Sequence, residues 1–340
     1  MRASLESSIG SSDRKPRFAG TQPVCQVTVI IIFLNEADFL AEAIESVRAQ
    51  SFAYWELLLV DDGSTDGSSE IARRFATREP DRIRYLDHQS HTTHGMSASR
   101  NLGIAHAMGE LLLFVDADDI IVPRTLEDQV TFMEAHPQVD TVYGPMCEWR
   151  SWDEGRGESD STLDLHLELD RVHSPQTILS TFLLHEDAVP SGNLLRTEVV
   201  RKVGGFEEEF TGAYEDQVFR VKFCRIASAY VSSRVWYYYR KHPKSCCAQI
   251  ISQGRMAAAR QRFLHWVESY CRVRGMQDRM LWRVIKRALR PFRYPRVSEV
   301  QTRLERHIDR WKAGVSDGIK DLLRPFVPTV VWAYLRDRLR

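Results

Sequence analysis

Between residues 27 and 116 the sequence alternates short apolar runs with segments whose apolar residues have helical spacing. The apolar runs are VTVIIIFL, WELLLVDD, RIRYLD and ELLLFVD. Strands that are apolar along their whole length are typical of a parallel sheet that helices cover on both faces. The alternation therefore predicts an α/β fold with a mainly parallel, Rossmann-like sheet flanked by helices.

Helices are expected between these strands and after the last of them. The first is expected over residues 35–50, beginning at Asn35, and the third is expected to end with Gly109 as its C-cap. A further helix is expected over residues 125–136, followed by the strand VDTVYG. Residues 150–171 are charged and contain glycine, which favours a surface excursion.

The later part of the chain continues with strands and helices. A strand and a short helix are expected to end at Gly204, and Glu215 is expected to open the next helix. The strand formers AYVSSRVWYYYRKH follow. Beyond Ala248 the sequence is Arg-rich and helical, with expected interruptions at Pro291 and Pro295.

Polar side chains follow three of the predicted strands, at the point where each strand ends. These side chains belong to Asn35 and Glu36, to Asp61 and Asp62, and to Asp116 and Asp118. Ligands of such sheets bind at the carboxyl ends of the strands. Two acidic strand ends and one Asn-Glu end on the same edge therefore predict a binding site.

The stretch LLLFVDADDI ends a buried strand in Asp116, Asp118 and Asp119. Neighbouring carboxylates raise one another's pKa and resist desolvation, so the cluster needs a compensating partner. Asp116 and Asp118 could share a hard divalent cation, which takes oxygen ligands and also binds substrate phosphates. Alternatively, Asp118 or Asp119 starts the helix after Pro123. The motif alone leaves both interpretations open.

The charge of the chain is unevenly distributed. Residues 251–340 hold 21 Lys and Arg against 8 Asp and Glu, whereas the whole chain holds 46 of each. A basic C-terminal part favours an anionic partner such as a membrane surface, or packing on the acidic remainder. Nucleic acid is not expected, because no recognition motif accompanies the charge. The six cysteines form no CxxC pair and no signal peptide is recognised, which predicts a reducing compartment.

Two groups of motifs resemble glycosyltransferase family 2, whose members are inverting enzymes with the GT-A fold. The first group is VTVIIIFLNEADFLAEAIESVRAQSF, WELLLVDDGSTDGSSEIARRFA and SASRNLGIAHAMGELLLFVDADD. The second group is GNLLRTEVVRKVGGFEEEF, YEDQVFRVKF and YYYRKHPKS. Together they cover most of residues 27–245 in the order and spacing of the family. The resemblance implies transfer of a sugar from a nucleotide-diphospho-sugar, expected to be UDP-linked, to a hydroxyl group.

The resemblance also implies which residues bind the donor. The matching positions are Phe33, Asn35, Glu36, Asp61, Asp62, Arg100, Asn101 and Asp116. In the family the first three line the nucleotide base, the two aspartates that follow contact uracil or ribose, and the Arg-Asn pair lies beside the nucleotide. Asp116 matches a carboxylate that faces the ribose or the metal, and Asp118 matches the direct metal ligand. A bound Mn²⁺ or Mg²⁺ would offset charge on the diphosphate.

An inverting transfer needs a general base that takes the proton of the acceptor hydroxyl. The resemblance assigns this role to Asp216, which follows Glu215 at a helix start; the alternative is a pair of ordinary first-turn acids. His242 matches a segment in which Arg or His approaches the diphosphate. It could be a third metal ligand, and Arg240 or Lys241 could hold phosphate oxygens.

The resemblance further implies how the chain is organised. The expected parts are a disordered lead-in (1–24), a GT-A domain (25–248) with a nucleotide-sugar-binding half (25–120) and an acceptor-binding half (121–248), and a basic helical extension (249–340). The acceptor is expected to be a glycan or lipid-linked, in polysaccharide synthesis for the cell envelope or exterior. We expect a cytoplasmic protein that contacts the anionic cytoplasmic face of the membrane through residues 251–340.

Two other functions and one other metal site fit the sequence less well. A nucleotidyltransferase would need a Gly-rich loop with Lys or Arg after the first strand, where this chain has FLNEAD. A catalytically silent sugar-binding scaffold would be favoured by loss of Asp118 or Asp216, and both are present. His88, His91 and His94 have a metal-like spacing, but they lie in a polar loop where the family is variable.

Overall fold

The computed structural model describes residues 25–153, 155 and 157–295. The expected lead-in 1–24 and residues 296–340 of the expected extension lie outside the described residues. The strands are β1 (Val27–Phe33), β2 (Trp55–Asp61), β3 (Ile83–Asp87), β4 (Leu111–Asp116), β5 (Ile120–Ile121), β6 (Thr141–Tyr143), β7 (Met146–Trp149), β8 (Ser161–Thr162), β9 (Arg171–His173), β10 (Leu194–Arg196), β11 (Ala229–Val231) and β12 (Tyr237–Arg240). The helices are α1 (Leu40–Arg48), α2 (Ser68–Arg78), α3 (Met96–His106), α4 (Thr125–Ala135), α5 (Pro175–Leu184), α6 (Thr197–Lys202), α7 (Glu215–Cys224), α8 (Cys246–Ser252), α9 (Met256–Val273) and α10 (Arg279–Arg293), with short 3₁₀ turns η1 (Gln89–His91) and η3 (Glu186–Ala188).

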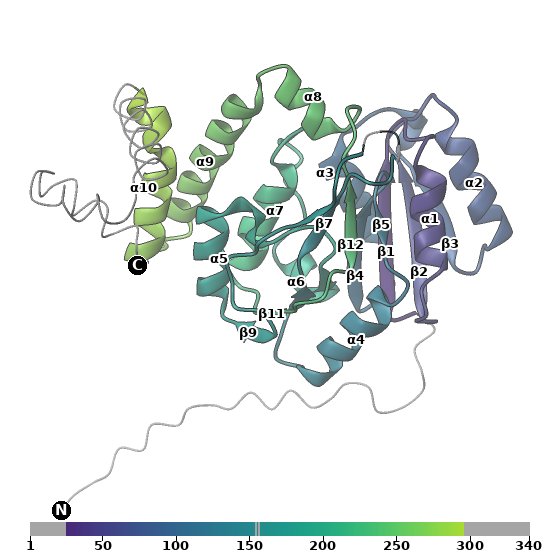
Figure 1. Cartoon of the computed structure of the whole chain (residues 1–340), viewed down its shortest axis with the longest axis horizontal. Coiled ribbons are helices and arrows are strands. Elements are labelled where there is room, and N and C mark those ends of the chain that lie inside the picture. Colours follow the sequence, from purple (N-terminus) through teal and green to yellow (C-terminus); the bar gives the residue numbers. More distant parts are fainter. Residues whose placement is uncertain (1–24, 154, 156, 296–340) are drawn as a thin grey trace, which may run out of the picture. The chain divides into compact units, whose positions relative to one another are not determined.

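The larger sheet has eight strands in the order β3-β2-β1-β4-β10-β6-β11-β9 (Figure 1). Strands β3, β2, β1 and β4 run parallel, and β10 pairs antiparallel with both β4 and β6. In the register, Phe33 lies opposite Asp61 and Ile32 lies opposite Asp116. The polar ends of β1, β2 and β4 therefore meet at one edge. The prediction of an α/β fold with a mainly parallel sheet is confirmed.

Both faces of the parallel strands are covered by helices, which explains why these strands are apolar throughout. On one face, Val29 and Ile31 of β1 belong to a core that also contains Leu40 and Ile44 of α1 and residues of α4. On the other face, α3 comes so close to β1 that a Cβ on Gly103 would lie 2.7 Å from Ile30. Every side chain of β1 is buried as a result.

A smaller sheet has the strand order β5-β12-β7-β8. Strand β12 is antiparallel to β5 and parallel to β7, with Tyr237 opposite Ile121. Because β5 begins directly after the turn at the end of β4, this pairing brings Arg240 at the end of β12 back to that turn. In residues 150–171, expected as a surface excursion, the two-residue strand β8 precedes the start of β9.

Two expected helix ends are wrong. Helix α1 begins at Leu40 instead of Asn35, since Asn35 has a φ of 58°, which a right-handed helix does not allow. Helix α3 ends at His106, so Gly109 is not its C-cap. Gly109 instead lies against the backbone of β1, where a Cβ would be 2.5 Å from the nitrogen of Thr28.

The C-terminal helices were expected from the sequence and are present. The expected interruption at Pro291 is wrong, because α10 runs through it to Arg293. Pro291 stands in the last turn, where its missing N–H costs one hydrogen bond. The chain divides into two compact units, with the boundary between Ile285 and Lys286 inside α10, so α8 and α9 belong to the unit that contains the sheets. No helix among the described residues has the length and apolar character needed to cross a bilayer.

Candidate active site

The turn after β4 carries the aspartates that end the strand. The backbone N–H of Asp119 donates to the carbonyl of Asp116 at 3.1 Å. The carboxylate of Asp119 is fully buried and accepts the backbone N–H of Arg240 at 2.7 Å, and burial raises its pKa well above the usual range. Asp119 thus ties β12 to the turn. The alternative that Asp118 or Asp119 caps the next helix is wrong, because Arg124 occupies the N-cap position of α4.

Asp118 faces the segment that follows β12. Its Oδ2 lies 2.9 Å from Nε2 of His242, and His242 is 6% exposed with its Nδ1 buried and without a hydrogen-bond partner. The backbone carbonyl of Asp118 accepts a hydrogen bond of 2.7 Å from Nε of Arg240. The structure therefore brings Asp118 and His242, both predicted as metal ligands, into direct contact.

The acidic side chains at this edge fit a divalent cation that shares its coordination with phosphate. Burial, followed by the charges of Asp118, Asp66, Asp38 and Asp116, raises the pKa of Glu36 to about 8. A cation would relieve this repulsion. Within the part of the chain that the structure describes, no three His, Cys, Asp or Glu side chains are arranged to hold an ion by themselves. Mn²⁺ and Mg²⁺ commonly bind through one or two carboxylates and take further oxygens from phosphate and water.

Arg100 links the end of β4 to the start of α7. Its guanidinium lies 2.6 Å from Oε1 of Glu215 and 3.1 Å from Oδ1 of Asp116, over the ring of Phe206. Arg100 and Glu215 are both buried. Burial and the charge of Asp216 raise the pKa of Glu215 to about 7, although Arg100 opposes the shift. Burial likewise raises the pKa of Asp116, with Arg100 lowering it.

Asp216 lines a pocket whose empty space, open solvent included, is about 570 Å³. Its Oδ2 forms an ion pair of 2.9 Å with Nη1 of Arg220, whose Nη2 donates to Oγ of Ser191. Asp116 and Arg100 line the same pocket, and its apolar lining includes Phe219 and Phe223 of α7 and Phe114 of β4. The structure thus brings the predicted base Asp216 and the strand-end carboxylate Asp116 to one cavity. Sequence reasoning missed Arg220, although its spacing of four residues from Asp216 on a helix was a usable signal.

Asp61 and Asp62 at the end of β2 have protein partners. Asp61 is fully buried; hydrogen bonds from Ser69, Ser64 and Tyr85 lower its pKa against the opposing effect of burial. Asp62 accepts the backbone N–H groups at 94 and 95 and the hydroxyl of Ser99. Both carboxylates therefore hold loops in place beside the strand end. Their contact with a nucleotide stays a prediction.

Asn35 and Asn101 are also held by neighbouring backbone. The side-chain oxygen of Asn35 accepts the N–H of Thr65 at 2.8 Å. The amide of Asn101 pairs with the backbone N–H and carbonyl of Phe206 at 2.8 and 3.0 Å. Phe33 is buried at the end of β1. Phe33 and Asn35 lie at the predicted edge, and the roles of all three residues in donor binding stay predictions.

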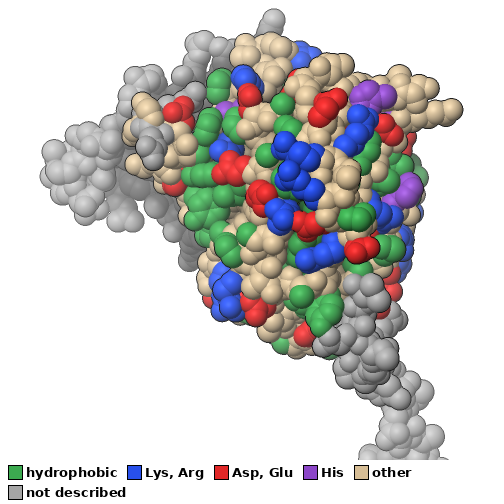
Figure 2. All heavy atoms as spheres, turned by 90° about the vertical axis from the view of Figure 1, so that its right-hand side faces the viewer, with side chains coloured by type: hydrophobic (Ala, Val, Ile, Leu, Met, Phe, Trp, Pro, Cys, Tyr) green, Lys and Arg blue, Asp and Glu red, His purple; other side chains and the backbone are tan. Residues whose placement is uncertain are grey.

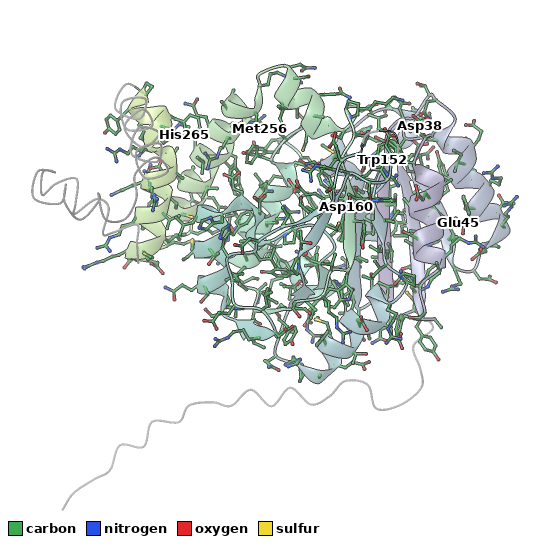
Figure 3. The ribbon with its side chains drawn as sticks, in the orientation of Figure 1. Asp38, Glu45, Trp152, Asp160, Met256 and His265 are labelled. Atoms are coloured by element: carbon green, nitrogen blue, oxygen red, sulfur yellow. The ribbon has the colours of Figure 1, made fainter. Side chains whose placement is uncertain are left out.

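Arg240 occupies an aromatic enclosure that the sequence did not reveal. Its guanidinium carbon lies 4.8, 4.4 and 5.0 Å from the ring centres of Phe39, Trp149 and Trp152. Figure 3 labels Trp152 near this end of the sheet. Arg240 is 3% exposed and also pairs with Glu42 at 2.6 Å. The guanidinium is therefore occupied in supporting the turn after β4, and direct contact with a donor phosphate stays a prediction.

The histidines of the polar loop after β3 have separate partners. The rings of His88 and His94 stack at 4.3 Å, and Nε2 of His88 lies 2.9 Å from the hydroxyl of Ser99. Nε2 of His91 lies 2.9 Å from the carbonyl of Ser64. The loop is thereby packed over the end of β2. Lys241, the other candidate for phosphate contact, pairs with Glu148 at 3.2 Å.

Comparison with known families and proteins agrees with this geometry. The model of the family described as Glycosyl transferase family 2 matches residues 28–204, just over half of the chain. The putative glycosyltransferase EpsE of Bacillus subtilis is 42% identical over 117 residues, which cover 34% of this chain and 41% of EpsE. The minor teichoic acid biosynthesis protein GgaB of the same organism is 32% identical over 162 residues, 46% of this chain and 18% of GgaB. The chain thus spans less than half of these relatives.

Solved structures resemble the fold. TarS of S. aureus, residues 1–349 in complex with UDP, has a TM-score of 0.59 at 21% identity, over 80% of this chain and 73% of that one. The mannosyltransferase PcManGT of Pyrobaculum calidifontis, in complex with GDP-Man and Mn²⁺, has a TM-score of 0.55 at 21% identity, over 88% of this chain and 79% of that one. At this level of identity the likeness establishes the GT-A fold alone.

Proposed function

Because the chain belongs to glycosyltransferase family 2, we propose that it moves a sugar from a nucleotide-diphospho-sugar, most simply a UDP-sugar, to a hydroxyl of a glycan or lipid-linked acceptor. The observation that carries the proposal is the convergence of Asp116, Arg100 and Asp216 on one pocket. Asp118, two residues after Asp116 in the chain, is in contact with His242. Inverting transfer needs groups that stabilise the negative charge of the leaving diphosphate, and a general base within reach of the acceptor hydroxyl.

The donor would bind along the ends of β1, β2 and β4. We assign contacts with the nucleotide base and the ribose to Phe33, Asn35, Glu36, Asp61, Asp62, Arg100 and Asn101. Asp116 would face the ribose or the cation. Asp118, Asp116 and His242 would hold Mn²⁺ or Mg²⁺, which when bound would neutralise the diphosphate oxygens. TarS was solved with UDP and PcManGT with GDP-Man and Mn²⁺, which supports a donor and a metal of this kind.

Asp216 would act as the general base. Its carboxylate takes the proton of the acceptor hydroxyl while that oxygen bonds to the anomeric carbon and the sugar–phosphate bond breaks on the opposite face. Arg220 keeps the carboxylate turned toward the pocket through its 2.9 Å ion pair. Glu215, whose pKa is raised to about 7, is anchored to Arg100 and so sets the start of α7.

For the acceptor side, the C-terminal helices suggest a membrane contact. Arginines of α9 have local partners: Arg260 pairs with Glu186 at 2.8 Å, and Arg262 donates to the carbonyl of Glu209. Helix α10, RMLWRVIKRALRPFR, carries six basic residues and no acidic one. We therefore propose that α10 is the part of the extension that contacts an anionic membrane, at the cytoplasmic face where lipid-linked acceptors are elongated.

The decisive experiment is a donor screen that measures Mn²⁺-dependent nucleotide release with and without acceptor. We expect Asp216→Asn to lower acceptor-dependent turnover by about 10²- to 10⁴-fold while donor binding is kept. Asp118→Ala should abolish the Mn²⁺-dependent part of donor binding. Asp164→Asn, an aspartate whose side chain is 80% exposed on a distant loop, is the matched control and should behave as wild type.

The same screen separates the proposal from its rivals. Full turnover in both the Asp216→Asn and Asp118→Ala variants would contradict the assigned mechanism. Binding of nucleotide-sugars without any turnover by the wild-type chain would favour a catalytically silent sugar-binding scaffold. Release of pyrophosphate from a nucleoside triphosphate would favour a nucleotidyltransferase.

A further inference from the structure

Tyr214 stands directly before Glu215 and has a left-handed backbone, with φ 75° and ψ 6°. This conformation suits glycine or asparagine, and for a bulky aromatic residue it is a true outlier. Such residues persist only where surrounding contacts hold them, and they cluster at functional sites. The contacts of Tyr214 should therefore reveal what fixes the entry to α7.

The side chain of Tyr214 is held at both its hydroxyl and its ring. The hydroxyl donates to Oε2 of Glu186 in η3 at 2.9 Å, and burial together with the charge of Glu186 raises the pKa of the phenol, which keeps it a donor. The ring stacks on Phe263 of α9, with centroids 5.0 Å apart and planes 24° apart. Phe263 is fully buried, and Arg260 of α9 donates to the other oxygen of Glu186 at 2.8 Å.

Helix α9 also holds the residues that lead up to Tyr214. Nη2 of Arg262 donates to the carbonyl of Glu209 at 2.5 Å, and the same guanidinium lies 4.5 Å from the ring centre of Phe210. Trp266, one turn further along α9, meets Phe210 edge to face at 6.0 Å. Figure 3 labels Met256 and His265 on this helix. The loop that enters α7 is thus fixed at positions 209, 210 and 214 by one face of α9.

We propose that α9, acting through Tyr214, positions Glu215 and Asp216 for the reaction. The inference rests on the proposed function and gives the helical extension a role in it. Tyr214 is a positioning residue: it touches no reacting atom, and it transmits the placement of α9 to the first turn of α7. A displacement of about 1 Å of a catalytic group can cost roughly 10²-fold in rate, so the anchoring should be visible in kcat.

Three variants separate positioning from general packing. Tyr214→Phe keeps the ring on Phe263 and loses the hydroxyl bond, and we expect kcat to fall about tenfold. Tyr214→Gly adopts the left-handed backbone without strain but loses both anchors, and we expect a fall of about 100-fold. The matched control is Tyr270→Phe, which removes a hydroxyl of the same helix that accepts from Arg225 at 3.2 Å, near the far end of α7. It should keep kcat within about twofold.

Binding of UDP with Mn²⁺, measured by calorimetry on the same proteins, supplies the second readout. We expect its Kd to change far less than kcat in the Tyr214 variants, because Tyr214 reaches the donor-binding edge only through the ion pair of Glu215 with Arg100. In Tyr270→Phe the Kd should stay within about twofold of wild type. Glu186→Gln, which keeps an oxygen for the phenol, should retain more kcat than Glu186→Ala. Melting temperatures show which variants are folded.

Each outcome decides the inference. Wild-type kcat in Tyr214→Gly would overturn it, since the backbone conformation alone would then suffice. An equal loss of UDP binding and kcat in the Tyr214 and Tyr270 variants would overturn it as well, in favour of a packing role. Failure of the proposed function gives a different result: either the wild-type chain transfers no sugar, or Asp216→Asn turns over normally whatever the Tyr214 variants do.

Discussion

The acidic residues at the strand ends differ in how much of their charge the protein itself satisfies. Asp61 and Asp62 accept hydrogen bonds from several loop groups, and Asp119 is buried against the backbone of β12. Among the described residues, Asp118 has His242 as a side-chain partner and Asp116 has Arg100. Oxygens that the protein leaves available are the ones that a cation or a substrate can use. At the residue scale, Asp116 and Asp118 are therefore better suited to ligand binding than their neighbours.

Glu36 permits a prediction about pH. Its pKa is about 8 in the folded chain, against an ordinary value of 4.5, so the folded state binds more protons between these values. The free energy of unfolding should therefore fall as pH rises from about 4.5 to about 8. In metal-free buffer at pH 8.5, Glu36→Gln should unfold with a free energy about 1 kcal/mol higher than wild type, a figure reduced for solvent screening.

Chemical denaturation at pH 8.5 and pH 4.5 checks this expectation. At the lower pH the two proteins should have nearly equal stability, because a protonated Glu36 is as neutral as glutamine. Glu70→Gln, an exposed acid on α2, is the control and should show no such difference between the two pH values. A Glu36→Gln variant that is no more stable than wild type at pH 8.5 would contradict the assigned repulsion.

At the scale of elements, Gly109 governs how the segment after α3 lies against β1. Its N–H donates to Oγ1 of Thr28 at 2.8 Å, and a Cβ would collide with the backbone there. Gly109→Ala should therefore lower the free energy of unfolding by about 1–3 kcal/mol. The control Gly155→Ala would place its Cβ 3.4 Å from Asp153, an ordinary contact, and should change stability by less than about 0.5 kcal/mol. Equal stability of the two variants, measured by urea denaturation, would refute the close approach.

Elements with a local signal were predictable from the sequence, and contacts between distant segments were not. The parallel strands and their acidic ends follow from continuous apolar runs and from the shared edge of a parallel sheet. The enclosure of Arg240 joins Phe39, directly before α1, with Trp149 of β7 and Trp152 of the loop after it, and no spacing in the sequence indicates that partnership. The left-handed Tyr214 was equally invisible, because tertiary contacts impose a conformation that its own propensity opposes.

At the scale of the whole molecule, the uneven charge has a testable consequence. On the face shown in Figure 2, where α1 and α2 lie, acidic and basic side chains are interspersed. Helix α10 carries six basic residues and no acidic one. Replacing Arg279, Arg283, Arg287 and Arg290 by Gln should weaken flotation with phosphatidylglycerol-containing vesicles by about 1 kcal/mol per charge at low salt. Arg74→Gln with Arg78→Gln, on α2, is the control and should float as wild type.

Vesicles of phosphatidylcholine alone, and a salt titration, complete that test. Binding to phosphatidylglycerol should weaken steeply as ionic strength rises, because exposed charges are screened beyond about 10 Å at 0.1 M salt. Equal flotation of the α10 variant and the wild-type chain would rule out α10 as the contact. Vesicle binding that changes with neither ionic strength nor lipid charge would indicate that an apolar surface makes the contact instead.

The ion pairs of Arg100 also bear on the order in which the chain can become active. One carboxylate partner, Asp116, lies 16 residues away, and the other, Glu215, lies 115 residues away. During synthesis the first four strands can pair before Glu215 has emerged. At that stage Arg100 has only one of its two carboxylate partners, Asp116. The last counter-ion and the proposed base arrive together on α7. A chain that ends before α7 would therefore lack both the second counter-ion of Arg100 and the proposed base.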